Sequence, residues 1–243
     1  MTDFQLEYNV LMQVNYSLEL LQRDEQDRGH IANELLLIKE AYRIRDCTVV
    51  ELGCGLGQNL QLFQADNEIL GIEGLGPAVL EAQSRGLAVC EGNLESPLEV
   101  KSGTADWLLC LDVLEHLVNS ISLLIEIRRI LRNGGKAILN VPNHFTLGGR
   151  LKILFGRNLD VHGFFPTSHD WDNPHLRFFT HRGLLQMVEA ADLTVVEDRS
   201  KHFCSFPKQN VFDQMGLGLV VRRFAQLRPS VFAAGFFLIV QKQ

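Results

Sequence analysis

The sequence predicts a single α/β domain built on a mainly parallel sheet, and three observations support this prediction. From Cys47 onward, short apolar runs alternate with stretches of helical periodicity, which is typical of repeated βαβ units. A glycine-rich turn follows the first of these runs directly. The 243 residues are 46% hydrophobic and 21% charged, a composition and length that suit one large globular core.

The elements follow one another in a regular order. Apolar residues spaced by three and four predict cap helices within residues 1–45. Strands are then expected at residues 48–52, 68–72, 87–91, 106–111, 136–141, 193–197 and 236–241. Helices are expected between them at residues 58–64, 77–85, 121–131 and 180–191. The domain therefore divides into cap helices (1–45), a cofactor-binding half (46–143), an insertion (144–179) and a C-terminal half (180–243).

The insertion is rich in glycine, phenylalanine and histidine and shows weak periodicity. A loop of this length inside a compact domain is usually functional, so we expect a lid that binds the acceptor. Its aromatic residues either line an acceptor pocket or pack beneath the loop: Phe145, Phe155, Phe164, Phe165 and Trp171. Its basic residues either bind an anionic acceptor or are solvated: Arg150, Lys152 and Arg157. Further along, residues 215–227 are expected to form an amphipathic helix that covers the sheet, in preference to a helix on a membrane surface.

Charge and composition exclude several classes of protein. A net charge of −6 and a pI of about 5.8 disfavour nucleic acid as a partner. The five cysteines include no C-x-x-C pair, which favours reduced thiols and a cytoplasmic location. We expect no secretory signal at the N-terminus, and the apolar run at residues 231–240 is too short to span a membrane.

The glycine-rich turn predicts a cofactor site. Gly53, Gly55 and Gly57 follow a buried strand and precede a helix, where glycines let the chain turn sharply and let a ligand lie against the backbone. The G-x-G-x-G spacing differs from the G-x-G-x-x-G of dinucleotide folds. Glu51, two positions before the first glycine, suits the ammonium group of a methionine moiety better than a phosphate.

A second acidic residue ends the next predicted strand. Glu73 lies 22 residues after Glu51 (73 − 51), where a carboxylate can accept both hydroxyl protons of a ribose. Taken alone, Glu73 is equally well explained as a solvated charge at a strand end. Together with the glycine turn, it favours a ligand that contains adenosine.

The sequence resembles the class I S-adenosylmethionine-dependent methyltransferases, in particular the small-molecule branch of MetW-like and ubiquinone-biosynthesis-type enzymes. Four segments carry the resemblance: VVELGCGLG (49–57), GIE (71–73), DWLLCLDVLEHL (106–117) and LRNGGKAILNVPN (131–143). The resemblance implies a Rossmann-like seven-stranded sheet of order 3-2-1-4-5-7-6 with helices on both faces. It also implies transfer of a methyl group to O, N or C of a small or medium-sized metabolite by in-line displacement, with S-adenosylhomocysteine as the product.

The resemblance also assigns cofactor contacts. The expected set is Glu51, Gly53, Cys54, Gly55, Gly57, Glu73, Gly74, Asn93, Leu94, Asp112 and Val113. In this assignment Glu51 and Gly53 contact the methionine moiety, Glu73 contacts the ribose and residues 92–94 contact the adenine. Many relatives have Asp where this chain has Asn93, whose side chain can both accept and donate a hydrogen bond. Asp112 is expected to face the methionine end and the acceptor.

Two histidines are the candidate catalytic residues. His116 follows the fourth predicted strand, where ligands of open α/β sheets collect, although it could equally be a packing or capping residue. His175 lies in a segment, His175 to Thr180, that is similar to one recurring in the same branch, with Thr180 as a helix N-cap and Arg177 facing the acceptor. A general base is needed only for some acceptors, such as a hydroxyl.

Histidines and aspartates crowd the insertion, which raises the question of a metal. The residues concerned are His144, His162, His169, Asp170, Asp172 and His175. Their spacings match no metal site of known geometry, so no metal is expected. Two rival functions stay open: a non-catalytic protein that binds S-adenosylmethionine as a partner or regulator, and an NAD-dependent oxidoreductase. The sequence carries no feature that sets an oligomeric state.

Overall fold

The computed structural model describes residues 29–156, 175–206 and 209–243, which contain a seven-stranded mixed sheet. The strand order is β3-β2-β1-β4-β5-β7-β6, which confirms the predicted order. β1 pairs with β2 and β2 with β3 in parallel, whereas β7 is antiparallel to both β5 and β6. The chain divides into two compact units, one that ends at Leu109 and one that begins at Cys110.

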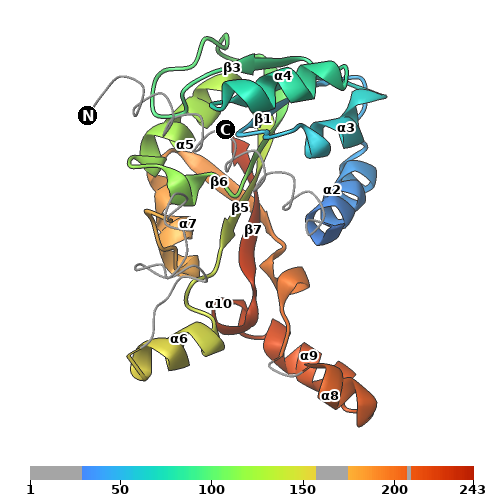
Figure 1. Cartoon of the computed structure of the whole chain (residues 1–243), viewed down its shortest axis with the longest axis vertical. Helices are drawn as coiled ribbons and strands as arrows, with labels where there is room; N and C mark the ends of the chain where they lie inside the picture. Colours follow the sequence, from blue (N-terminus) through green and yellow to red (C-terminus); the bar gives the residue numbers. More distant parts are fainter. Residues whose placement is uncertain (1–28, 157–174, 207–208) are drawn as a thin grey trace, which may run out of the picture. The chain divides into compact units, whose positions relative to one another are not determined.

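The first unit contains the glycine turn and the helices and strands on either side of it in the chain (Figure 1). They are α2 (Gly29–Tyr42), β1 (Thr48–Leu52), α3 (Gln58–Gln64), β2 (Glu68–Glu73), α4 (Gly76–Ser84), β3 (Val89–Glu91) and most of β4 (Ala105–Leu111). Four of the five residues of β1 are buried, as the β-branched run at this position predicts. Leu60 of α3 and Val79 of α4 belong to one buried apolar cluster with Leu87 and Val89, which holds both helices against the strands.

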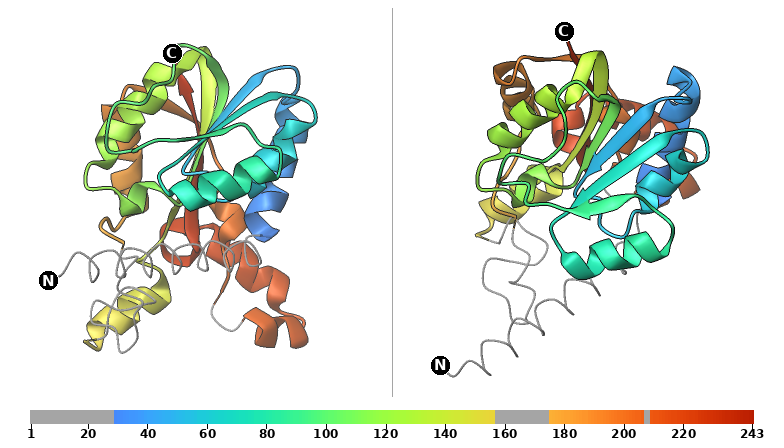
Figure 2. Two further views of the ribbon diagram at one scale, coloured as in Figure 1. Left: turned by 45° about the horizontal axis from the view of Figure 1, so that its top comes forward. Right: turned by 90° about the horizontal axis from the view of Figure 1, so that it is seen from above.

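The second unit contains the remaining elements. They are η1 (Leu114–His116), α5 (Ser120–Ile130), β5 (Leu131–Pro142), α6 (Leu147–Leu154), α7 (His181–Ala190), β6 (Leu193–Asp198), η3 (Ser200–Phe203), α8 (Gln209–Gln214), α9 (Gly218–Gln226), α10 (Pro229–Phe232) and β7 (Gly235–Lys242). α5 and α7 lie side by side, while α6, α8 and α9 lie at the end of β5 and β7 where β5 finishes and β7 begins (Figures 1 and 2).

Several predicted boundaries agree with the structure. β1 and α3 have the predicted bounds, and the Thr180 side chain accepts a hydrogen bond from Gly183 N as the predicted N-cap of α7. The second half of the predicted cap region is α2, which buries Ile31, Leu35 and Ile38. Its first half, over residues 6–21, lies outside the described residues. β5 begins five residues earlier than expected, at Leu131 instead of 136 (136 − 131 = 5).

Several elements differ from the predictions, among them the short helices η1, η3, α8 and α10, which were not expected. α6 was not expected, because two glycines in its first turn weaken the helical pattern; Thr146 caps it by accepting from Gly149 N. The prediction that the helix at 215–227 covers the sheet is wrong. Val220 of α9 is 65% exposed and Phe224 is 54% exposed, and α9 packs against α8 and α10.

Among the described residues, no helix is both long and apolar enough to cross a bilayer.

Candidate functional site

The glycine turn after β1 is built from left-handed backbone. Gly53, Gly55 and Gly57 have φ angles of 70°, 53° and 82°, which glycine adopts at the least cost. The Gly53 and Cys54 N–H groups donate to the Ile72 carbonyl (2.7 and 3.3 Å), and this ties the turn to β2. A Cβ atom at position 57 would lie 2.1 Å from Leu87 Cδ1. A larger residue at position 57 would therefore require the buried Leu87 side chain to move.

Glu51 is the buried carboxylate at this end of β1. It is 1% exposed, and its Oε1 accepts a hydrogen bond from Asn59 Nδ2 of α3 at 2.8 Å. Asn59 is itself buried, so the orientation of the carboxylate is set by the packing of α3 on β1. A buried carboxylate at the carboxyl end of a parallel strand is suited to bind a cationic group such as an ammonium.

Glu73 is held by the backbone of both loops that flank it. Its Oε2 accepts from Gly55 N at 2.8 Å, and its Oε1 accepts from Leu75 N at 2.9 Å. Each carboxylate oxygen has two lone pairs, so each keeps one for a further donor such as a ribose hydroxyl. The glycine turn and the acidic strand end, which the sequence marked separately, therefore form one hydrogen-bonded unit.

The Cys54 thiol lies within this unit but has no chemical role in it. Burial raises the pKa of Cys54 far above its usual value, and the carboxylates of Glu51 and Glu73 raise it further. A thiol that keeps its proton is a poor nucleophile. Any contribution of Cys54 to ligand binding would therefore come from its backbone or its apolar surface.

A pocket of about 330 Å³ opens beside the ends of β2 and β3. Gly92 and Asn93 line it together with Ile72 and residues 96–100. The Asn93 Oδ1 already accepts a hydrogen bond from Glu95 N at 2.9 Å. The side-chain nitrogen of Asn93 is therefore the group better able to form a hydrogen bond with a ligand, as a donor. Leu94, half-buried, does not belong to this lining, and Gly74 is exposed at the start of the neighbouring loop.

In the second unit, Asp112 follows β4 in a strained conformation. Its φ is +55°, a value that non-glycine residues rarely adopt. Two hydrogen bonds to Asn140 of β5 hold it there, one from Asp112 N to the Asn140 carbonyl (3.0 Å) and one from Asn140 Nδ2 to Asp112 Oδ1 (2.6 Å). Strain that neighbouring residues maintain in this way is common at functional sites. Val113, next in the chain, is buried and precedes η1.

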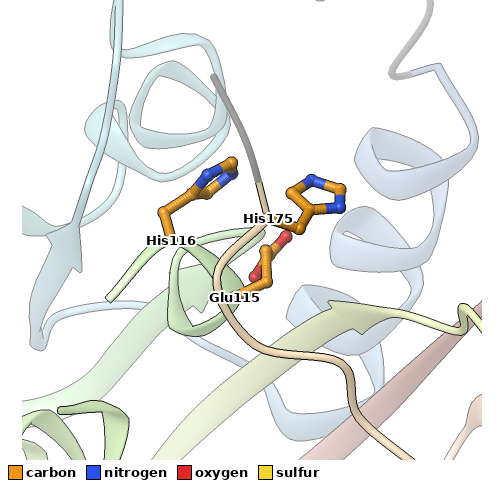
Figure 3. Close-up of side chains that lie close together, drawn as sticks. All are labelled: Glu115, His116 and His175. Carbon is orange, nitrogen blue, oxygen red and sulfur yellow. The ribbon is translucent and has the colours of Figure 1, made fainter. Parts of the chain in front are cut away.

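The two candidate catalytic histidines lie close together (Figure 3). The Glu115 carbonyl of η1 accepts from Leu176 N (2.8 Å) and Arg177 N (3.0 Å), which fixes His175 beside η1. The ring centroids of His116 and His175 are 4.9 Å apart. Arg177 itself donates to the Val118 carbonyl, so its guanidinium is occupied by the backbone near η1.

Two further residues belong to this cluster: Glu115, which was not singled out from the sequence, and His144, which was named there among the histidines of the insertion. Glu115 is 1% exposed and groups with His116 and His175, with one possible ligand atom from each residue and all of these atoms within 4.8 Å of one another. His144 is also buried, and its Nε2 lies 2.7 Å from His175 Nδ1. The only sequence signal was the position of Glu115 directly before His116 after a buried strand.

The structure describes only some of the other candidate residues of the predicted insertion, and these do not line the site. Phe155 is 75% exposed, and it lines no pocket formed by the residues that the structure describes. Arg150 donates to the carbonyls of Phe145 (2.8 Å) and Ser230 (3.3 Å), and Lys152 is exposed. The remaining candidates lie outside the described residues: Arg157, His162, Phe164, Phe165, His169, Asp170, Trp171 and Asp172.

Comparison with known proteins places the chain among related sequences. Residues 19–198 match the family described as "Methyltransferase domain". An uncharacterised protein of Methanocaldococcus jannaschii is 37% identical over 115 residues, which is 46% of this chain. The match spans about half, 48%, of that curated relative.

Solved structures share the fold at low sequence identity. One belongs to the complex between the Haloferax volcanii Trm112 methyltransferase activator and the putative methyltransferase (TM-score 0.61, 19% identity, 92% of this chain and 93% of that chain). Another is the magnesium protoporphyrin IX methyltransferase of Synechocystis with bound S-adenosylhomocysteine (TM-score 0.61, 15% identity, 91% and 87%). At these identities the likeness concerns the fold alone.

Proposed function

The chain belongs to the methyltransferase-domain family of class I, S-adenosylmethionine-dependent enzymes, and from this premise we propose that it methylates a small or medium-sized metabolite. The observation that carries the proposal is the Glu73 carboxylate, which the N–H groups of Gly55 and Leu75 hold against the glycine turn. This arrangement offers a ribose two acceptor oxygens beside a backbone that a ligand can approach closely.

The residues around the turn suit the parts of the cofactor. We assign the ammonium of the methionine moiety to Glu51, the ribose to Glu73 and the adenine to the pocket beside Asn93. Backbone contacts are assigned to the turn itself and to the loops after β2, β3 and β4: Gly53, Cys54, Gly55, Gly57, Gly74, Leu94, Asp112 and Val113. The sequence resemblance assigns Asp112 and its neighbour Val113 to the methionine end of the cofactor, next to the acceptor.

S-adenosylmethionine, when bound, supplies a methyl group already activated by its positive sulfur. The protein must then hold the acceptor in line and, for a hydroxyl acceptor, remove a proton. We assign the base to the pair His116 and His175. The 2.7 Å contact between His144 Nε2 and His175 Nδ1 supports this, because in the tautomer in which His175 Nδ1 donates, His175 Nε2 carries the lone pair that a base needs.

Charge and cysteine chemistry support the remaining parts of the proposal. A net charge of −6 favours a small acceptor over nucleic acid. All five cysteines fall within the described residues, and all are free thiols. This supports a reducing compartment, and we propose the cytoplasm.

A second candidate is suggested by the fold shared with the Trm112 complex of Haloferax volcanii. A chain of this kind could act together with a protein activator or serve as a binding partner without activity of its own. The discriminating measurement is methyl transfer by the purified chain alone, compared with transfer after addition of cell extract as a source of activators.

Calorimetry with S-adenosylmethionine and NAD in parallel tests the proposal. We expect S-adenosylmethionine to bind and NAD to give no heat at the same concentrations. Incubation with metabolite pools should then yield a product heavier by one methylene group. NAD binding in the absence of S-adenosylmethionine binding would overturn the proposal in favour of an oxidoreductase.

A further inference from the structure

We propose that Glu115, His116 and His175 bind a divalent transition-metal ion, with Zn²⁺ as the best match to the donor set. The three side chains offer ligand atoms that all lie within 4.8 Å of one another (Figure 3). Donor atoms arranged tetrahedrally around one zinc ion at about 2.0–2.2 Å lie about 3.3–3.6 Å apart, roughly 1–1.5 Å closer than the upper limit of the separations here. Small side-chain rotations would therefore bring the three ligands onto one ion.

The backbone presents these ligands in fixed positions. Glu115 and His116 are consecutive residues of η1, and the Ser120 hydroxyl donates to the Leu114 carbonyl at 2.6 Å, which anchors that turn to the start of α5. His175 is brought to the same place by the two N–H groups that donate to the Glu115 carbonyl. Ligands held by such contacts lose little freedom when an ion binds, which favours binding.

A second layer of contacts orients His175. Its Nδ1 lies 2.7 Å from Nε2 of the buried His144, and the His144 ring in turn packs edge to face on Phe178 (centroids 4.7 Å apart). When Nδ1 of a metal-binding histidine is occupied by a hydrogen bond, Nε2 is the nitrogen presented to the ion. The cluster thus has both the ligands and the supporting contact of a metal site.

The donor chemistry selects the class of ion. Two imidazole nitrogens and one carboxylate oxygen suit Zn²⁺ and other borderline transition ions, whereas Mg²⁺ prefers oxygen ligands alone. Three protein ligands also leave a coordination position for a further oxygen. If the proposed methyltransferase function holds, on which this step rests, the acceptor would be a metabolite that carries a hydroxyl or carboxylate oxygen to that position. With the ion bound, the two histidines would be ligands and no longer the base, and the ion itself would make a bound hydroxyl easier to deprotonate.

The test titrates the full chain, freed of metal by a chelator, with Co²⁺ and follows its visible absorption, which reports nitrogen and oxygen ligands. We expect one equivalent of Co²⁺ to bind, Zn²⁺ to displace it and Mg²⁺ to leave it in place. His175→Gln and Glu115→Gln should weaken binding by at least about tenfold, and His144→Gln by about 10–100-fold. The matched control is His30→Gln, an exposed histidine of α2, which should bind as the wild type does.

Circular dichroism and the affinity for S-adenosylmethionine, measured on each variant, show whether it folds. Should His175→Gln not fold, His116→Gln, at a half-buried ligand, takes its place. Absence of Co²⁺ binding by the wild type, or equal binding by His175→Gln and His30→Gln, would overturn the metal site. Failure to bind S-adenosylmethionine with the ion bound would instead count against the proposed function, so the two failures are distinguishable.

Discussion

Replacement of Glu73 by alanine is the sharpest test of the cofactor site. The substitution removes the acceptors of two backbone N–H groups, at 2.8 and 2.9 Å, and the two oxygens assigned to the ribose. Hydrogen bonds to a charged group contribute about 1.5–3 kcal/mol each. The half-buried Leu75 N–H can regain water, whereas the buried Gly55 N–H loses its partner. We therefore expect the free energy of unfolding to fall by about 1–3 kcal/mol.

Binding of S-adenosylmethionine should weaken as well. Loss of the ribose contacts is expected to cost about 1–3 kcal/mol, which raises the dissociation constant for S-adenosylmethionine roughly 5–150-fold. Calorimetry measures this constant directly, and urea unfolding measures the change in stability. The matched control is Glu68→Ala, the same substitution at the exposed opposite end of β2, which should leave the constant unchanged. A Glu73→Ala constant within twofold of the wild type would refute the reasoning.

Three further predictions concern stability. Gly57→Ala places a Cβ atom 2.1 Å from Leu87 Cδ1 at a φ of 82°. Its control is Gly86→Ala, at a φ of 79° with open space around the new Cβ atom. In urea unfolding Gly57→Ala should lose about 1–3 kcal/mol more stability than Gly86→Ala, and equal losses would contradict the packing argument. Burial raises the pKa of the Cys204 thiol to about 11 from 9.0, so the unfolded chain loses this proton first and stability should fall between these pH values. Cys204→Ala should flatten that decline in pH-dependent unfolding, and an unaltered slope would show that another group titrates. Thr180→Ala removes the N-cap of α7 and should lower the unfolding free energy by about 1 kcal/mol, whereas Thr180→Ser should restore most of it.

The elements of the fold were predictable because they follow from local patterns. The β-branched run at β1 and the helical residues of α3 carry their own periodicity, and glycine at three alternate positions indicates a turn that other residues resist. α6 was not predicted because its local pattern is weak. Gly148 and Gly149 disfavour a helix, although Thr146 caps its first turn.

The sequence by itself determined the strands of a mainly parallel sheet, the glycine turn and the acidic residues Glu51 and Glu73, and the strand order followed from the resemblance to the family. Only the tertiary structure decided that Glu73 is bound to the turn, that Asn140 holds Asp112, and that His175 lies beside Glu115. Glu115 and His175 are 60 residues apart (175 − 115), and no periodicity relates them. Contacts of this kind depend on how loops pack after the strands have paired, and that information lies in the whole fold and not in any local segment.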